Sequence, residues 1–283
     1  MGDPMVRALL KAGFPVCAWN RSPGKIDPLI PLGAKRAETS GQAIEQADVV
    51  ITMLETGPVV DQVLFGADQA SKAAKPGTLF IDMSSIPPQT ARAHAANLIE
   101  QGCSYLDAPV SGGTAGAEAA SLAIMAGGDV SQLEYARPIF EAMGRVTHVG
   151  PHGSGQLAKL ANQAIVAVTI GAVSEALLLA AAGGADPRAV REAIRGGFAE
   201  SRILELHGGR MLERNFEPGG RASVQLKDID TIIETASALN LNLPAVKAVQ
   251  DVFRALVDGG GGDLDHSAYL VELEEKNAPY TVK

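Results

Sequence analysis

The chain has 283 residues, of which 46% are hydrophobic and 20% are charged, and its formal net charge at pH 7 is −8. This composition is typical of a soluble globular protein, and the length suits one or two domains. The acidic balance argues against a general nucleic-acid binder, because such proteins are usually basic. We therefore expect no nucleic-acid partner.

The two cysteines, Cys17 and Cys103, lie far apart and form no Cys-x-x-Cys pair, so the sequence predicts neither a disulfide framework nor a zinc site. Together with a first segment that has no signal-peptide organisation, this favours a cytoplasmic location. The most apolar stretch, 164–182, contains Ser174 and Glu175. An ionisable residue in a bilayer is costly, so we predict a buried helix there and no membrane partner.

The first half of the chain alternates between helical and strand patterns. Helices are predicted at 2–12, 42–46, 59–74, 88–101 and 132–143. Strands are predicted at 15–19, 48–54, 78–84, 104–110, 121–128 and 145–150. Strands that alternate with helices predict βαβ units, hence an α/β fold with a doubly wound, mostly parallel sheet of the Rossmann type.

After Gly155 the strand patterns stop. Helices are predicted at 156–183, 187–196, 202–212, 223–240, 244–258 and from 266 onwards. We therefore predict a Rossmann-like domain over 1–152 and an all-helical domain over 153–283. The helical domain has more apolar surface than one small sheet domain can cover, so we expect a homodimer or homotetramer built through it.

In a Rossmann fold, the cofactor pyrophosphate rests on the start of the first helix, after a G-x-G-x-x-G turn. Here only Gly2 stands before that helix, so the first strand and the first two glycines are expected to be missing, which would leave two unpaired strand edges. At the end of the second predicted strand, Asn20 and Arg21 stand where an acidic residue would bind the ribose of NAD. An arginine can pair with a 2′-phosphate, which favours NADP over NAD. The alternative is that Arg21 is an exposed loop charge.

Two other segments follow predicted strands, at the edge where ligands bind in open α/β sheets. Ser84 and Ser85 contact the cofactor there, or they cap the next helix. The segment Ser111–Gly112–Gly113 offers consecutive amides that can form a nest for a substrate carboxylate, or it is a flexible turn.

The segment GSGQLAKLANQ, 153–163, places Lys159, Asn162 and Gln163 at i, i+3 and i+4, on one face of a helix. The helix is otherwise apolar and lies at the predicted domain junction. Burial there would lower the pKa of a lysine from about 10.4 towards neutral, as a general acid/base requires. The alternative is a solvated surface lysine. In LKDID, Lys227 beside Asp228 either reaches the cofactor or belongs to a solvated charged turn.

Four segments together resemble the β-hydroxyacid dehydrogenase family: MGDPMVRALLKAGFPVCAWNRS, LDAPVSGGTAG, GPHGSGQLAKLANQ and QLKDID. The resemblance runs from residue 2 to about residue 280. SEALLLA, AIRGGFAES, RNFEPGGR and DHSA are most similar to the tartronate semialdehyde (2-hydroxy-3-oxopropionate) reductase branch. The resemblance implies an NAD(P)H-dependent oxidoreductase that interconverts a short β-hydroxyacid and its semialdehyde, most closely tartronate semialdehyde to D-glycerate.

The resemblance also implies roles for individual residues. Lys159 is the expected catalytic residue. The expected substrate-binding residues are Ser111, Gly112, Gly113, Asn162 and Gln163. The expected cofactor-binding residues are Gly2, Met5, Asn20, Arg21, Ser22, Met53, Leu54, Ser85, Lys227 and Asp228. The cofactor is NADP or NAD, and no metal is expected.

Two alternatives stay open from the sequence. One is a 3-hydroxyisobutyrate dehydrogenase or another short-chain semialdehyde reductase. The other is a non-catalytic cofactor-binding or assembly module with an impaired NAD(P) site. The missing first strand favours this second alternative, whereas the joint presence of Lys159, Asn162 and the Ser-Gly-Gly segment opposes it.

Overall fold

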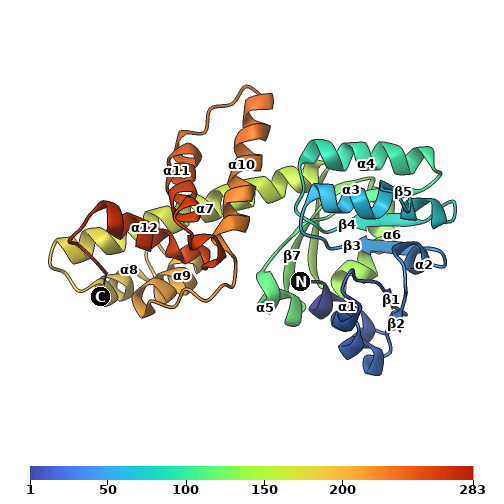
Figure 1. Cartoon of the computed structure of the whole chain (residues 1–283), viewed down its shortest axis with the longest axis horizontal. Helices are drawn as coiled ribbons and strands as arrows, with labels where there is room; N and C mark the ends of the chain where they lie inside the picture. The colour runs from blue at the N-terminus through green and yellow to red at the C-terminus, as the bar shows by residue number, and fades with distance from the viewer. Residues whose placement is uncertain (283) are drawn as a thin grey trace. The chain divides into compact units, whose positions relative to one another are not determined.

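The computed structural model describes residues 1–282, and the chain forms two compact units, Met1–Lys159 and Leu160–Lys283 (Figure 1). The first unit is α/β and the second is all-helical, so the predicted fold class is confirmed. The predicted domain boundary after residue 152 lies just before a long helix, α7, whereas the compact units divide within the second turn of that helix.

The first unit is built on a six-stranded sheet. Its strands are β3 (Val49–Thr52), β4 (Leu79–Asp82), β5 (Ser104–Asp107), β6 (Val110–Ser111), β7 (Leu122–Gly128) and β8 (Gly144–Gly150). The strand order is β3-β4-β5-β7-β6, and β8 also pairs with β7. Strands β3, β4 and β5 are parallel, so Thr52, Asp82 and Asp107 meet as neighbours at one edge of the sheet.

Successive residues of a strand point to opposite faces of the sheet, so both faces are apolar. Helices cover each of them. Leu79 and Ile81 belong to one apolar cluster, and Phe80 belongs to the other. The first cluster includes residues of α1 (Gly2–Lys11), α5 (Gly113–Glu118) and α6 (Val130–Glu141). The second includes residues of α2 (Ser40–Ile44), α3 (Gly57–Phe65), the 3-10 helix η3 (Ala70–Ala73) and α4 (Pro88–Glu100).

Two short strands, β1 (Cys17–Ala18) and β2 (Lys35–Arg36), form a separate parallel pair. A Rossmann order places one more strand between β1 and β3, and no such strand occurs among residues 1–282. Within that range β1 pairs only with β2 and β3 only with β4, so the two expected unpaired edges are present. The segment between β1 and β2 forms two 3-10 helices that the sequence did not predict, η1 (Pro23–Lys25) and η2 (Asp27–Leu32).

The second unit is a helical domain. Its helices are α7 (Ser154–Ala182, which begins in the first unit), α8 (Pro187–Ile194), α9 (Arg202–Glu213), α10 (Ala222–Ala238), α11 (Pro244–Asp258) and α12 (Tyr269–Lys276), with the short 3-10 helices η4 (Gly261–Asp263) and η5 (His266–Ala268). Phe253 and Tyr269 are almost fully buried, and their ring centroids lie 5.0 Å apart. Helix α7 contributes Ile170 and Leu177 to the same core.

By length and composition alone, α7 could cross a membrane, and 39% of its most apolar window is buried. Ser174 is buried and donates a hydrogen bond to the Ile170 carbonyl. On the other side, Ile165 and Leu179 are 68% and 75% exposed. The helix therefore packs through one face, whereas the sequence predicted a buried helix.

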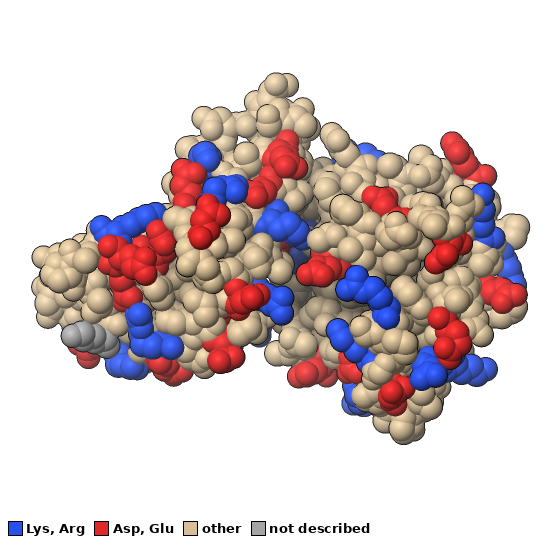
Figure 2. All heavy atoms as spheres, in the orientation of Figure 1, with Lys and Arg blue, Asp and Glu red and all other residues tan. Residues whose placement is uncertain are grey.

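Charged side chains of both signs are interspersed over the visible surface of each unit (Figure 2). This distribution agrees with the mixed composition of 24 basic and 32 acidic residues.

Candidate active site

The site begins with two buried carboxylates at the ends of β4 and β5. Asp82 Oδ1 accepts hydrogen bonds from Thr52 Oγ1 at 2.8 Å and from the Ser84 amide at 3.0 Å. Burial raises the pKa of Asp82, while the hydrogen bonds from Ser84 and Thr52 act in the opposite direction. These bonds fix the first residues of the loop that follows β4.

Asp107 ties the end of β5 to the start of α7. Its Oδ1 accepts a hydrogen bond from the Gly153 amide at 2.7 Å, and its Oδ2 accepts one from the Gln156 amide at 2.9 Å. Burial raises the pKa of Asp107, and these two amide bonds oppose the rise. The first amides of a helix have no partner within the helix, and a carboxylate is favourable at that end. Asp107 therefore determines where α7 begins.

Gly155 allows this close approach. A Cβ atom at Gly155 would overlap the carbonyl oxygens of Asp107 and Met125. The backbone of α7 thus lies directly against the ends of β5 and β7, and no larger residue fits at this position.

The side chain of Gln156, which is fully buried, attaches α7 to the loop after β4. Its Oε1 accepts a hydrogen bond from the Ile86 amide at 3.1 Å, and its Nε2 donates one to the Ser84 carbonyl at 2.8 Å. Ser84 Oγ in turn accepts a hydrogen bond from the Leu54 amide at 2.9 Å. Gln156 therefore holds both sides of Ser85. Gln156 was not predicted from the sequence, since its partners lie about 70 residues away and only its place three residues before Lys159 marks it.

The predicted residues of the first unit fall at these strand ends. Lys159 is half-buried and follows Gln156 by three residues, so the two share a face of α7. Ser85 is half-buried in the loop held by Gln156. Neither Ser84 nor Ser85 caps the next helix, because the N-cap of α4 is Pro87; the capping alternative is wrong.

The Ser-Gly-Gly segment is a strand-to-helix turn. Ser111 ends β6, and Gly112 precedes α5. Gly112 and Gly113 have φ of 138° and 64°, a backbone region that favours glycine. Both glycines are exposed.

The residues expected at the adenosine end lie around β1 and α1. Asn20 Oδ1 accepts a hydrogen bond from the Ser22 amide at 2.9 Å, which closes the turn after β1. Arg21 is exposed and has no ion pair within residues 1–282.

The remaining first-unit residues of the predicted cofactor set differ in burial. Gly2 is the first residue of α1 and is half-buried. Met53 and Leu54 are half-buried just after β3. Met5 is only 3% exposed and its side chain belongs to the sheet core, so only its backbone can face a ligand.

In the second unit, four predicted residues form one polar network between α7 and α10. Asn162 Nδ2 donates to Gln163 Oε1 at 2.9 Å, and Gln163 Nε2 donates to Asp228 Oδ2 at 2.7 Å. Lys227 Nζ lies 2.9 Å from Asp228 Oδ1, and the Asp228 side chain is 5% exposed. Lys227 and Asp228 are therefore part of a largely buried network and do not form a solvated charged turn.

Comparison with known proteins agrees with this organisation. Residues 1–150 match the NAD-binding domain of 6-phosphogluconate dehydrogenase, and residues 153–273 match the NAD-binding family of NADP-dependent 3-hydroxyisobutyrate dehydrogenase. The chain is 46% identical to 2-hydroxy-3-oxopropionate reductase of Escherichia coli, over 97% of this chain and 94% of that protein. It is 37% identical to an NAD-dependent L-serine dehydrogenase of Pseudomonas aeruginosa, over 94% and 92% of the two chains.

Solved structures give the same result. The structure of Mycobacterium tuberculosis 3-hydroxyisobutyrate dehydrogenase with L-serine is similar at a TM-score of 0.88 and 34% identity, covering 96% of this chain and 95% of that one. The fold and the matched families thus define a nicotinamide-dependent oxidoreductase. The chain belongs to the β-hydroxyacid dehydrogenase family, as its motifs predicted.

The bridge made by Gln156 gives a first testable prediction. Gln156→Leu keeps the size of the side chain but leaves the buried Ile86 amide and Ser84 carbonyl without partners. We expect the free energy of unfolding to fall by about 2–4 kcal/mol, measured by urea denaturation. The matched control is Gln62→Leu at an exposed position of α3. This change should alter the free energy of unfolding by less than about 0.5 kcal/mol. Equal effects in the two variants would contradict the bridging role.

Proposed function

We propose that this protein reduces tartronate semialdehyde to D-glycerate, with NADPH preferred over NADH. The observation that carries the proposal is the placement of Lys159 on a helix whose first turn is fixed to the ends of β4 and β5. The 46% identity to a 2-hydroxy-3-oxopropionate reductase supports this substrate.

The residues at the adenosine end fit an NADP cofactor. Arg21 is an exposed cation, so it is available for a 2′-phosphate. No acidic side chain occupies 19–22, where a carboxylate would repel that phosphate. Ser85, held between two hydrogen-bonded neighbours, is assigned to the nicotinamide end. The reduced nicotinamide, when bound, supplies the hydride for the reaction.

Lys159 is assigned the proton transfer. As the aldehyde carbon gains the hydride, the carbonyl oxygen becomes an alkoxide, and the protonated Lys159 Nζ donates a proton to it. In the reverse direction, neutral Lys159 removes the proton from the hydroxyl. A cationic lysine also stabilises the developing negative charge.

The substrate carboxylate is assigned to the Ser111–Gly113 turn, whose consecutive amides can converge on one anion. Asn162 and Gln163 are assigned to the substrate hydroxyl groups. Gln163 is held by Asp228, so its orientation is set before substrate arrives. This preorganisation contributes to the rate by positioning.

The assignment of Lys159 is tested by Lys159→Ala. Turnover should fall by at least ~100-fold because no other group replaces the proton donor, whereas NADPH binding should change little. Steady-state rates and NADPH fluorescence titration measure the two effects. The matched control is Lys72→Ala, at an exposed position, which should retain full turnover. Near-normal turnover in Lys159→Ala would refute the assignment.

The substrate and cofactor are tested together with the wild-type protein. The 3-hydroxyisobutyrate alternative implies a methyl group where the proposed substrate carries a hydroxyl, and L-serine is the substrate named for one relative. A site built to hydrogen-bond a hydroxyl should prefer tartronate semialdehyde over methylmalonate semialdehyde by at least ~100-fold in kcat/KM. The panel includes L-serine oxidation and is run with both NADPH and NADH.

The outcome of this panel separates all the candidate functions. A preference for the methyl analogue or for L-serine would contradict the proposed substrate. A preference for NADH would contradict the assigned role of Arg21. Absence of turnover with every pair, together with weak NADPH binding, would favour the non-catalytic alternative.

We also propose that a second copy of the chain covers the exposed face of α7. Ile165, Ala172 and Leu179 are exposed and seven residues apart, so they lie along one stripe of the helix. Exposed apolar stripes of this kind mark association surfaces. The double change Ile165→Glu and Leu179→Glu should convert a dimer or tetramer into a monomer in light scattering. Phe198→Glu, at another exposed apolar residue, is the control. A monomeric wild type would refute the proposal.

A further inference from the structure

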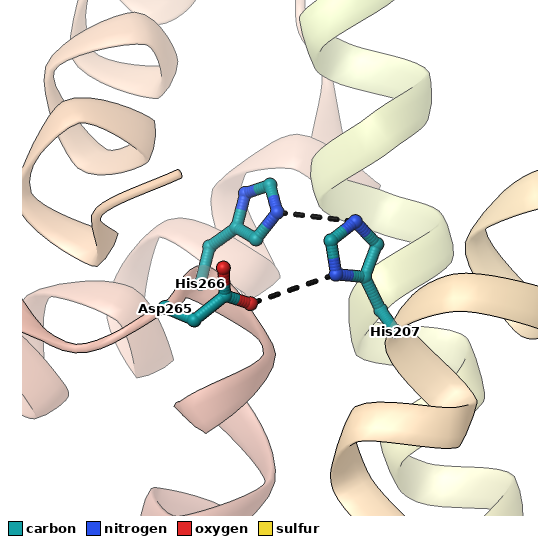
Figure 3. Close-up of side chains that lie close together, drawn as sticks. All are labelled: His207, Asp265 and His266. Atoms are coloured by element: carbon teal, nitrogen blue, oxygen red, sulfur yellow. Dashed lines mark hydrogen bonds and ion pairs between the residues drawn. The ribbon is translucent and has the colours of Figure 1, made fainter. Parts of the chain in front are cut away.

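Two histidines of the helical unit face each other. His207 belongs to α9 and His266 to η5, and their Nε2 atoms are 3.2 Å apart (Figure 3). The ring centroids are 4.4 Å apart, and the rings are nearly perpendicular at 85°. Neither histidine has a role in the proposed reaction.

Oxygen atoms face the other nitrogen of each ring. Asp265 Oδ1 lies 3.6 Å from His207 Nδ1, and Gln225 Oε1 lies 3.3 Å from His266 Nδ1. An oxygen of this kind can only accept, so this arrangement favours a hydrogen on each Nδ1. Each Nε2 atom of a neutral ring then has a lone pair that can bind a metal ion.

Asp265 is held rigidly and is ionised. It is fully buried, and it accepts hydrogen bonds from the Ser267 amide and hydroxyl on Oδ1 and from the Gly219 and Gly220 amides on Oδ2. Burial by itself raises the pKa of Asp265, but the neighbouring His207 ring and the hydrogen bonds from Ser267 outweigh it and hold that pKa well below its ordinary value. A fixed carboxylate behind an imidazole orients the ring and increases its basicity as a metal ligand.

We propose that His207 and His266 bind a divalent transition-metal ion of the Zn²⁺ class through their Nε2 atoms, with Asp265 as the orienting partner of His207. Two nitrogens at about 2.0–2.1 Å from a tetrahedral Zn²⁺ lie roughly 3.3 Å apart, which agrees with the observed 3.2 Å. One ligand atom from each of His207, Asp265 and His266 lies within 4.8 Å of the others.

The metal ion can reach the site from solvent, and one nearby positive charge, that of Arg210, opposes its binding. The His207 side chain is 15% exposed, so an ion can reach it from solvent, and water completes the coordination. Arg210 Nη1 lies 3.5 Å from the other carboxylate oxygen of Asp265, and Asp228 is a further charged neighbour of His266. The bound ion would join α9 to η5 and stabilise the helical unit, which departs from the metal-free protein expected from the sequence.

The test uses the untagged full chain with Co²⁺ and Zn²⁺ as probes. Wild-type protein should bind one Co²⁺ per chain with visible d–d absorption, and Zn²⁺ should displace it and raise the melting temperature. His207→Gln and His266→Gln should each weaken Co²⁺ binding by about tenfold or more. The matched control, His148→Gln, removes an exposed histidine of the first unit and should bind like the wild type.

A second measurement needs no variant. The chain has five histidines, and Zn²⁺ should shift the imidazole NMR signals of two of them in the wild type. No Co²⁺ binding by the wild type, or unchanged binding in both variants, would overturn the proposal. Imidazole signals that shift with pH but not with Zn²⁺ would also overturn the proposal, because His207 and His266 would then share a proton and bind no metal. None of these measurements depends on reductase activity.

Discussion

The buried carboxylate of Asp107 is the constraint on which the geometry of the candidate active site depends. A charged group without exposure is costly unless hydrogen bonds compensate it, and here the amide of Gly153, just before α7, and that of Gln156 in its first turn do so. Bonds of this charge-assisted kind contribute about 1.5–3 kcal/mol each. Because the same turn leads directly to Lys159, the position of that lysine is set by the end of strand β5. The absence of a Cβ at Gly155 is the steric condition for the same contact.

Long elements were predictable from the sequence, and short ones were not. Helix α7 was predicted at 156–183 and spans Ser154–Ala182, because its apolar pattern extends over many turns between glycines. By contrast, α5 was not predicted, and β6 was not separated from β5. They contain six and two residues, too few to show a period. Strand β1 is shorter than the predicted strand, since within residues 1–282 it pairs with another strand on one side only.

The site was predictable as far as it follows local spacing. The i, i+3, i+4 pattern placed Lys159, Asn162 and Gln163 on one face of a helix, and adjacency suggested the Lys227–Asp228 pair, which the structure contains. Contacts between distant segments left no such signal. The partners of Gln156 lie on the loop after β4, and His207 meets a histidine 59 residues further along the chain. Such pairs depend on how helices and strands pack, which periodicity does not specify.

The two ends of the expected cofactor site are held in place by very different contacts. At the nicotinamide end, Ser85 lies in a loop fixed by Asp82, Leu54 and Gln156. At the adenosine end, Arg21 follows a two-residue strand that lies outside the main sheet. Residues near β1 pack against the sheet core through partly buried side chains such as Phe14 and Val16 and through α1. In the proposed reaction, the residues assigned to hydride and proton transfer therefore lie at a sheet edge held by many hydrogen bonds, whereas the residues assigned to the adenosine phosphate lie in local turns. A change near β1 should consequently alter cofactor affinity before it alters the geometry around Lys159.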